Sequence, residues 1–161
     1  MKYLAALLWI IGMLACQSKG TESIENQTTK IHLNEILPGN WEALSFRVQM
    51  NTFQNTDSSF VLEVKAGEWE DKLQMRPIQT EYSADNRYRS YSYNRSDSLI
   101  HTERGIWNVF GDTLMLISPE ATYQYQVIVE SEILEFRSLL DWDGDGQEDD
   151  EYIGIQRRKK E

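Results

Sequence analysis

An acidic loop near the end of the chain carries the residues best suited to chemistry. Residues 141–151 are Asp-Trp-Asp-Gly-Asp-Gly-Gln-Glu-Asp-Asp-Glu. Aspartates at alternating positions followed by glycine begin many calcium-binding loops, because the alternation directs carboxylates toward one ion and the glycine permits a sharp turn. The expected ligands are carboxylates and one backbone carbonyl, from Asp141, Asp143, Asp145, Gln147 and Asp149.

This loop differs from an EF-hand loop. Its twelfth position, where an EF-hand has a bidentate glutamate, is Tyr152, and the flanking segments have the pattern of strands. The loop offers many oxygen ligands but no imidazole or thiolate, which favours calcium over magnesium. We expect such an ion to be structural, holding the last hairpin together. The alternative is a solvated acidic turn without a metal.

The single cysteine, Cys16, follows a basic start and an almost unbroken apolar run over residues 4–14. A bilayer-spanning helix needs about 20 apolar residues, so this run is typical of a signal peptide, expected over residues 1–15. The ending Met13-Leu14-Ala15-Cys16 resembles the lipobox of bacterial lipoproteins, in which the cysteine is acylated and becomes the mature N-terminus. The alternatives are an ordinary secretory signal that leaves a free thiol, and an uncleaved anchor.

The lipobox resemblance implies a location in the bacterial cell envelope. Acyl chains on Cys16, palmitate among them, would anchor the protein in the bilayer of the outer membrane, facing the periplasm or the cell surface. The following residues, 16–30, are polar and without periodicity, so we expect a flexible tether. A lone cysteine cannot form an internal disulfide, so the domain must be stabilised by its core.

Composition excludes several classes of function. The chain has 26 acidic and 16 basic side chains, a net charge of −10, which argues against nucleic acid and against a polybasic membrane contact. Its two histidines, His32 and His101, have no second histidine or cysteine at zinc-binding spacing. No nucleophile elbow and no phosphate-binding loop is present in the sequence. We expect a binding protein and not an enzyme, with an enzyme as the third alternative because the absence of a motif is weak evidence.

From residue 31 onward the chain has the pattern of short strands separated by turns. Residues 44–50 and 123–129 alternate in polarity, and Asp85-Asn86 is typical of a hairpin turn. Trp69 and Leu73, four apart among charged residues, predict one short helix. Eight or nine strands at regular spacing predict an all-β domain over residues 31–161, an antiparallel up-and-down barrel of about eight strands, with a sandwich as the alternative.

Two glycine–tryptophan motifs carry a family resemblance. Gly39-Asn40-Trp41 precedes the first strand, and Gly105-Ile106-Trp107 lies later in the chain. Over residues 33–158 this arrangement resembles the lipocalin-like lipoproteins of the Bacteroidota. The resemblance implies a barrel with one open and one closed end, where Trp41 lies under an arginine supplied by Arg157 or its neighbour Arg158. Trp41 and Leu44 have opposite parity, so either a bulge separates them or the strand begins after Trp41.

Aromatic side chains are candidates for lining a ligand cavity. They are Tyr88, Tyr91, Tyr93, Trp107, Tyr123, Tyr125 and Phe136. Arg87 and Arg89 share a face with Tyr91 and Tyr93, so an inward orientation of that face would suit an acidic lipid-like ligand. An eight-stranded barrel is either filled by side chains or hollow.

The leading hypothesis is an envelope lipoprotein whose barrel binds a small apolar or amphipathic molecule. The alternative is a calcium-stiffened module that contacts another envelope protein and binds no small molecule. An exposed apolar patch on a filled barrel would favour the alternative.

Overall fold

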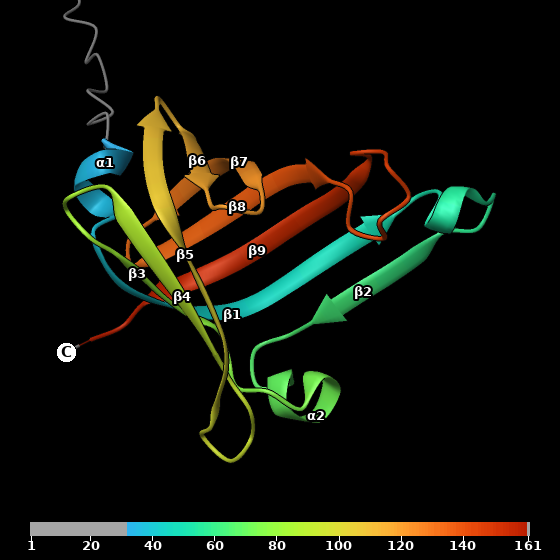
Figure 1. The fold of residues 1–161 in the computed structure, drawn as a ribbon, viewed down its shortest axis with the longest axis horizontal. Helices are drawn as coiled ribbons and strands as arrows, with labels where there is room; N and C mark the ends of the chain where they lie inside the picture. The colour runs from blue at the N-terminus through green and yellow to red at the C-terminus, as the bar shows by residue number, and fades with distance from the viewer. Residues whose placement is uncertain (1–31, 161) are drawn as a thin grey trace, which may run out of the picture. The chain divides into compact units, whose positions relative to one another are not determined.

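The computed structural model describes residues 32–160 (Figure 1). The expected signal peptide, Cys16 and the expected tether lie outside the described residues. None of the helices among the described residues is long and apolar enough to cross a membrane.

Nine antiparallel strands form the domain. They are β1 (Gly39–Met50), β2 (Phe60–Val64), β3 (Gln79–Tyr82), β4 (Arg87–Tyr93), β5 (Leu99–Phe110), β6 (Thr113–Ile117), β7 (Thr122–Glu130), β8 (Ile133–Leu140) and β9 (Asp150–Arg158). From β3 to β9 each strand pairs with the next, and β9 pairs with β1, which closes the sheet into a barrel. The prediction of an all-β, antiparallel, up-and-down barrel is confirmed.

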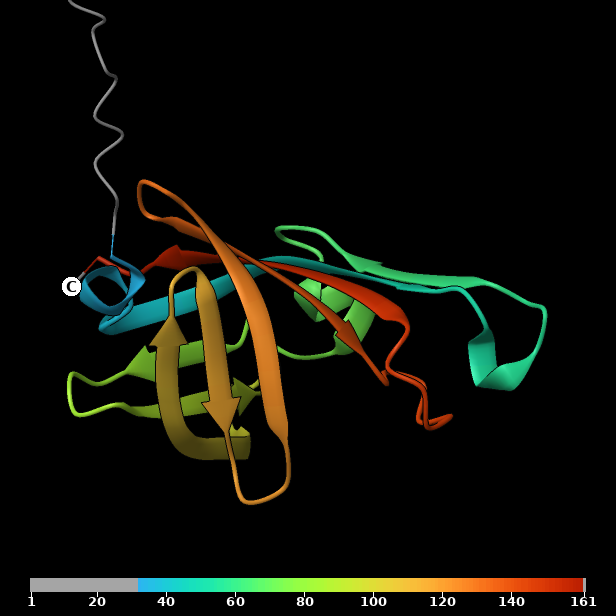
Figure 2. The ribbon, with the colours of Figure 1, turned by 90° about the horizontal axis from the view of Figure 1, so that it is seen from above.

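The second position of the barrel is shared by two strands. β2 pairs with Phe46–Met50 and β3 with Gly39–Glu42, both along the edge of β1 opposite to β9. Nine strands therefore fill eight positions. Between β2 and β3 the chain leaves the wall and forms the predicted helix, α2 (Trp69–Leu73), which Figure 1 shows between β2 and the β4–β5 hairpin. Figure 2 shows the β1–β2 hairpin extending past the other strands.

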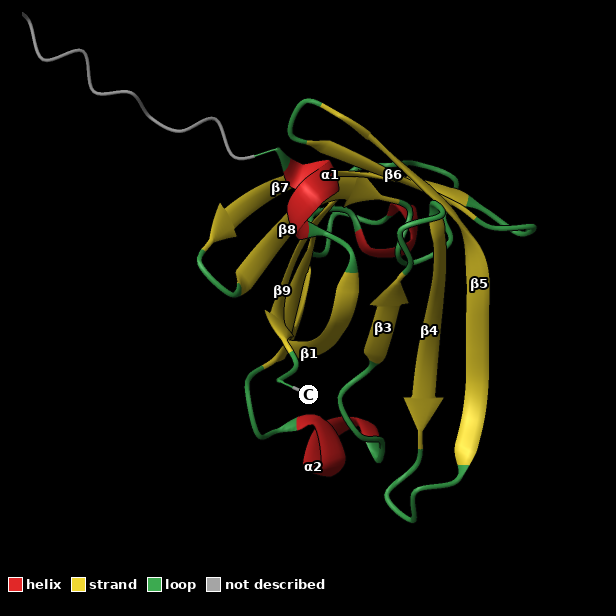
Figure 3. Ribbon diagram, turned by 90° about the vertical axis from the view of Figure 1, so that its left-hand side faces the viewer, coloured by secondary structure: helices red, strands yellow, loops and turns green. Residues whose placement is uncertain are grey.

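Two further short helical segments accompany α2. A 3₁₀ turn, Phe53–Asn55, lies in the β1–β2 connection. The other segment, α1 (Leu33–Ile36), lies at one end of the barrel (Figure 3). Leu33 and Leu37 are buried there against Trp41, and this burial holds so short a helix in place.

The closed end is built around Trp41. Its indole Nε1 donates to the carbonyl oxygen of Leu37 at 2.8 Å, and its ring lies 4.5 Å from the guanidinium carbon of Arg158. Arg158 also donates to the carbonyl oxygens of Pro38 and Ile36, so it joins the α1 segment to the barrel. Gly39 has φ +136° and its Cα faces the Arg158 guanidinium, so a side chain at this position would be both strained and obstructed.

Of the two candidate arginines, Arg158 covers Trp41, and the expectation of Arg157 is corrected. Arg157 lies one residue earlier on β9, and successive strand side chains point to opposite faces. Its guanidinium pairs instead with the Glu42 carboxylate on the outer face, at 2.8 Å.

A β-bulge resolves the parity conflict at the start of β1. The pairing of β1 with β9 shifts register between Ala43 and Ser45. The bulge lets Trp41 lie in the floor of the barrel while Phe46 and Val48 also point inward.

Candidate functional site

The barrel contains a cavity of about 850 Å³ that is open to solvent. Its walls come from the strands, from α2 and from the acidic loop before β9. Aromatic and aliphatic side chains dominate the walls, and a few hydroxyl, amide and carboxylate groups lie among them. A volume of this size, with mostly apolar walls and few polar groups, is typical of a site for a small organic molecule.

Four of the seven aromatic residues expected from the sequence line this cavity. They are Tyr88, Tyr123, Tyr125 and Phe136. They come from β4, β7 and β8, and Tyr125 packs edge-on against Phe136 with ring centroids 5.8 Å apart. Tyr88 and Phe136 are buried, whereas Tyr123 and Tyr125 are partly exposed to the cavity.

Tyr91, Tyr93 and Trp107 lie elsewhere. On β4 the cavity-lining residues are Tyr88, Ser90 and Ser92, so the alternation of the strand places Tyr91 and Tyr93 on the outer face. Arg87 and Arg89 share that outer parity, which removes the basis for expecting an acidic head group. Trp107 is 3% exposed in the core near the closed end, and its Nε1 donates to the carbonyl oxygen of Ser83 at 3.1 Å.

Sequence reasoning missed an aromatic cluster formed by Phe46, Trp69, Trp142 and Tyr152. Trp142 stacks on Tyr152 with centroids 5.9 Å apart, and Phe46 lies 5.8 Å from Trp142. Trp69, from α2, meets Phe46 edge-on at 5.5 Å. The alternation of residues 44–50 indicated that Phe46 shares a face with other apolar residues. No local pattern, however, links it to residues near the other end of the chain.

The polar groups of the cavity are mostly paired with one another. The Tyr88 hydroxyl donates to Glu103 Oε1 at 2.8 Å, and the hydroxyls of Thr80 and Ser90 lie 3.0 Å apart. The side-chain oxygen of Gln156 is buried without a hydrogen-bond partner among the described residues. This oxygen can accept a hydrogen bond from a bound molecule or from water.

Burial keeps the phenols of the cavity protonated. It raises the pKa of Tyr152 to about 12. Burial is also the main reason why the pKa of Tyr88 and that of Tyr125 lie well above the ordinary value, and the nearby Glu103 carboxylate raises both further. At neutral pH these side chains therefore present hydroxyl donors and uncharged rings to the cavity.

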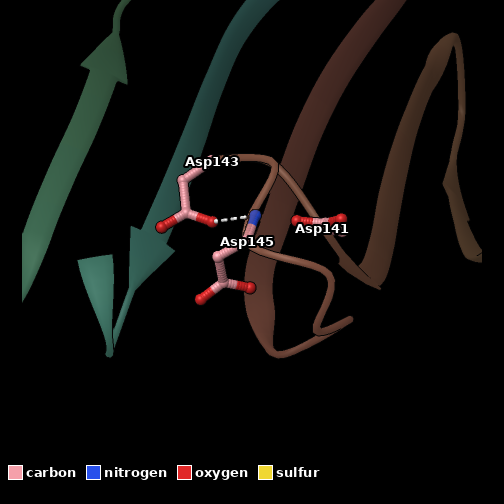
Figure 4. Close-up of side chains that lie close together, drawn as sticks. All are labelled: Asp141, Asp143 and Asp145. Atoms are coloured by element: carbon pink, nitrogen blue, oxygen red, sulfur yellow. Dashed lines mark hydrogen bonds between the residues drawn. The ribbon is translucent and has the colours of Figure 1, made fainter. Parts of the chain in front are cut away.

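The acidic loop brings together three of its predicted ligands. Carboxylate oxygens of Asp141, Asp143 and Asp145 all lie within 4.8 Å of one another (Figure 4). Within the loop these carboxylates accept backbone hydrogen bonds, among them one from Gly146 N to Asp141 at 3.1 Å and one from Gln147 N to Asp145 at 2.9 Å. Gly146 has φ +91°, so the turn requires a residue that tolerates positive φ.

The loop also docks on the β1–β2 connection. The backbone N–H of Asn55 donates to Asp145 at 3.1 Å. The remaining two predicted ligands have partners there as well: the Gln147 amide donates to Asn55 Oδ1 at 2.6 Å, and Asp149 accepts from the Thr52 hydroxyl at 3.1 Å. Two hairpins distant in the sequence are thus joined through the acidic loop, and calcium binding stays a prediction.

Calcium at about 5 mM should raise the melting temperature if the loop holds an ion. With a dissociation constant on the order of 10⁻⁴–10⁻³ M, as in extracellular calcium modules, binding would contribute about 1–2 kcal/mol. That corresponds to roughly 2–8 °C in a calorimetric scan of a domain of this size. Asp143→Ala should remove the rise, whereas Asp112→Ala, outside the loop, should preserve it. If calcium does not change the melting temperature of the wild type, the acidic loop is a turn held by its own hydrogen bonds.

The strand pairing establishes the barrel. No model of a known protein family matches this chain, and no curated protein matches it.

Proposed function

We propose that this protein binds a small apolar or amphipathic molecule inside its barrel, as a carrier or binding protein and not as an enzyme. The observation that supports this proposal is the open cavity of about 850 Å³ with aromatic walls. When an apolar ligand enters this cavity, each Å² of apolar surface removed from water contributes about 25 cal/mol to binding. Rings such as Tyr125 and Phe136 add shape-specific packing to that gain.

The same proposal places the protein at a bacterial membrane. The apolar run before Cys16 and the small residue that precedes it favour a lipoprotein anchored by acyl chains. The lipocalin-like lipoproteins remain the family that the chain resembles through Gly39-x-Trp41 and the late arginine. A barrel held at a membrane surface is suited to exchanging an apolar molecule with it.

The alternative, an interaction module, is favoured by one observation. Only the β1 side of β2 pairs with another strand among the described residues, and Phe60 and Val61 on β2 are 50% and 45% exposed. An exposed apolar edge strand is suited to pairing with another chain. This reading requires no ligand in the barrel, so a ligand-binding experiment separates the two functions.

Retinol, a neutral apolar probe, should bind the purified domain saturably and near one to one. Ser90→Trp should weaken this binding by about tenfold or more, because Ser90 lines the cavity and an indole there would overlap the ligand. The measurement is the rise of retinol's own fluorescence in a titration.

Arg89→Trp is the matched control, since Arg89 is the neighbouring residue on the outer face of β4. It should leave retinol affinity unchanged. If the wild type shows no saturable binding, the interaction module becomes the better account. If both variants bind retinol like the wild type, the ligand binds outside the cavity.

A further inference from the structure

Three carboxylate side chains line the cavity, those of Glu103, Asp141 and Glu148. The imidazole of His101 also lines it. None of the lysines and arginines between residues 32 and 160 is among the lining residues. The charge of the walls therefore opposes a ligand with a carboxylate or phosphate head and suits one with a positive head.

We propose that the cavity selects a molecule that joins an apolar body to a positively charged amine, and that Glu103 binds the amine. This inference rests on the proposed binding function and specifies its ligand class. Glu103 lies on β5, opposite Ser90 of β4, and its side chain is partly buried among the cavity phenols. Asp141 and Glu148 are exposed, so Glu103 is the least exposed to solvent of the three carboxylates.

Glu103 lacks an ionic partner within the described part of the chain. Other carboxylates have one: Glu42 pairs with Arg157 at 2.8 Å, and Glu135 pairs with Arg137. Glu103 receives one hydrogen bond, from the Tyr88 hydroxyl, and a carboxylate can accept about four. A partly buried carboxylate without a cation is unfavourable, so an ammonium ligand would gain both charge compensation and charge-assisted hydrogen bonds.

The surroundings of Glu103 suit the rest of such a ligand. Tyr123 and Tyr125 line the same cavity as Glu103. Their ring faces can contribute cation–π attraction to an ammonium group. The unpartnered oxygen of Gln156 is a second acceptor for an N–H group, and the aromatic cluster supplies a surface for the apolar body.

Three probes with one tail and different heads test the inference: dodecylamine, dodecanol and dodecanoate at pH 7, each measured by displacement of retinol. The affinity for dodecylamine should be at least about tenfold higher than the affinity for dodecanol or for dodecanoate. Glu103→Gln should remove this preference and leave dodecanol affinity within about threefold, because glutamine keeps the shape and can still accept from Tyr88. Glu103→Asp, which retains the charge, should retain the preference.

Glu130→Gln is the control, because it removes one negative charge from an exposed residue of β7. This variant should bind the three probes like the wild type. Equal affinity for the three probes, or tightest binding of dodecanoate, would overturn the charge preference while leaving the proposed binding function intact. Persistence of the preference in Glu103→Gln would overturn the role of Glu103. If none of the three probes displaces retinol, this inference fails even though retinol binds. The wild-type comparison needs no variant, so it remains decisive if Glu103→Gln does not fold.

Discussion

Replacing Trp41 with alanine should lower the free energy of unfolding by about 3–5 kcal/mol, the range expected for a large aromatic side chain removed from a core. Trp41 is fully buried, its indole donates to Leu37, and Arg158 covers its ring. The substitution leaves a cavity and an unpaired carbonyl on Leu37, and it removes the cation–π contact between Arg158 of β9 and Trp41 of β1. Urea unfolding followed by circular dichroism measures the loss.

Trp142→Ala is the comparison, because Trp142 is 42% exposed and packs in the aromatic cluster instead of the closed end. It should cost clearly less than Trp41→Ala. A loss below about 1 kcal/mol for Trp41→Ala would mean that the closed end contributes little to stability, contrary to its burial.

Replacing Cys16 with serine should move the full-length protein from the membrane fraction to the soluble fraction of a bacterium that processes lipoproteins. The thiol is the group that would carry the acyl chains, and serine cannot replace it in thioether formation. Incorporation of labelled palmitate should disappear in the same variant. Fractionation by ultracentrifugation and the label give two independent measurements.

Ser18→Ala, two residues further along the chain, is the control and should leave both measurements unchanged. Retention of Cys16→Ser in the membrane fraction, without palmitate in the wild type, would instead favour an uncleaved anchor. A soluble wild type without label would favour an ordinary secretory signal.

Local sequence patterns predicted much of the architecture. The alternation of residues 123–129 and the turn at Asp85-Asn86 correspond to β7 and to the β3–β4 connection. Trp69 and Leu73 bound α2 as their spacing predicted. These features depend on neighbours in the chain, where strand and helix periodicity are encoded directly.

The acidic loop shows what a local sequence pattern predicts and what it does not. Its alternating aspartates predicted that three carboxylates gather, and they do. Their docking on Asn55 and Thr52 follows from the pairing of β1 with β9, which brings two distant hairpins together. No spacing within residues 141–151 contains that information.

The sequence by itself determined most of the strands and turns and α2, whereas Trp41, expected just before the first strand, lies within β1. Only the tertiary structure decided which face of each strand points inward. On β4, aromatic residues occur on both faces, so the alternation of residues 87–93 did not distinguish Tyr88 from Tyr91. On β9, a shift of one residue separates Arg158 in the floor from Arg157 outside. The physical reason is that side chains alternate between the two faces of a strand, so the sequence of one strand does not show which face points into the barrel. That choice is made when the barrel closes.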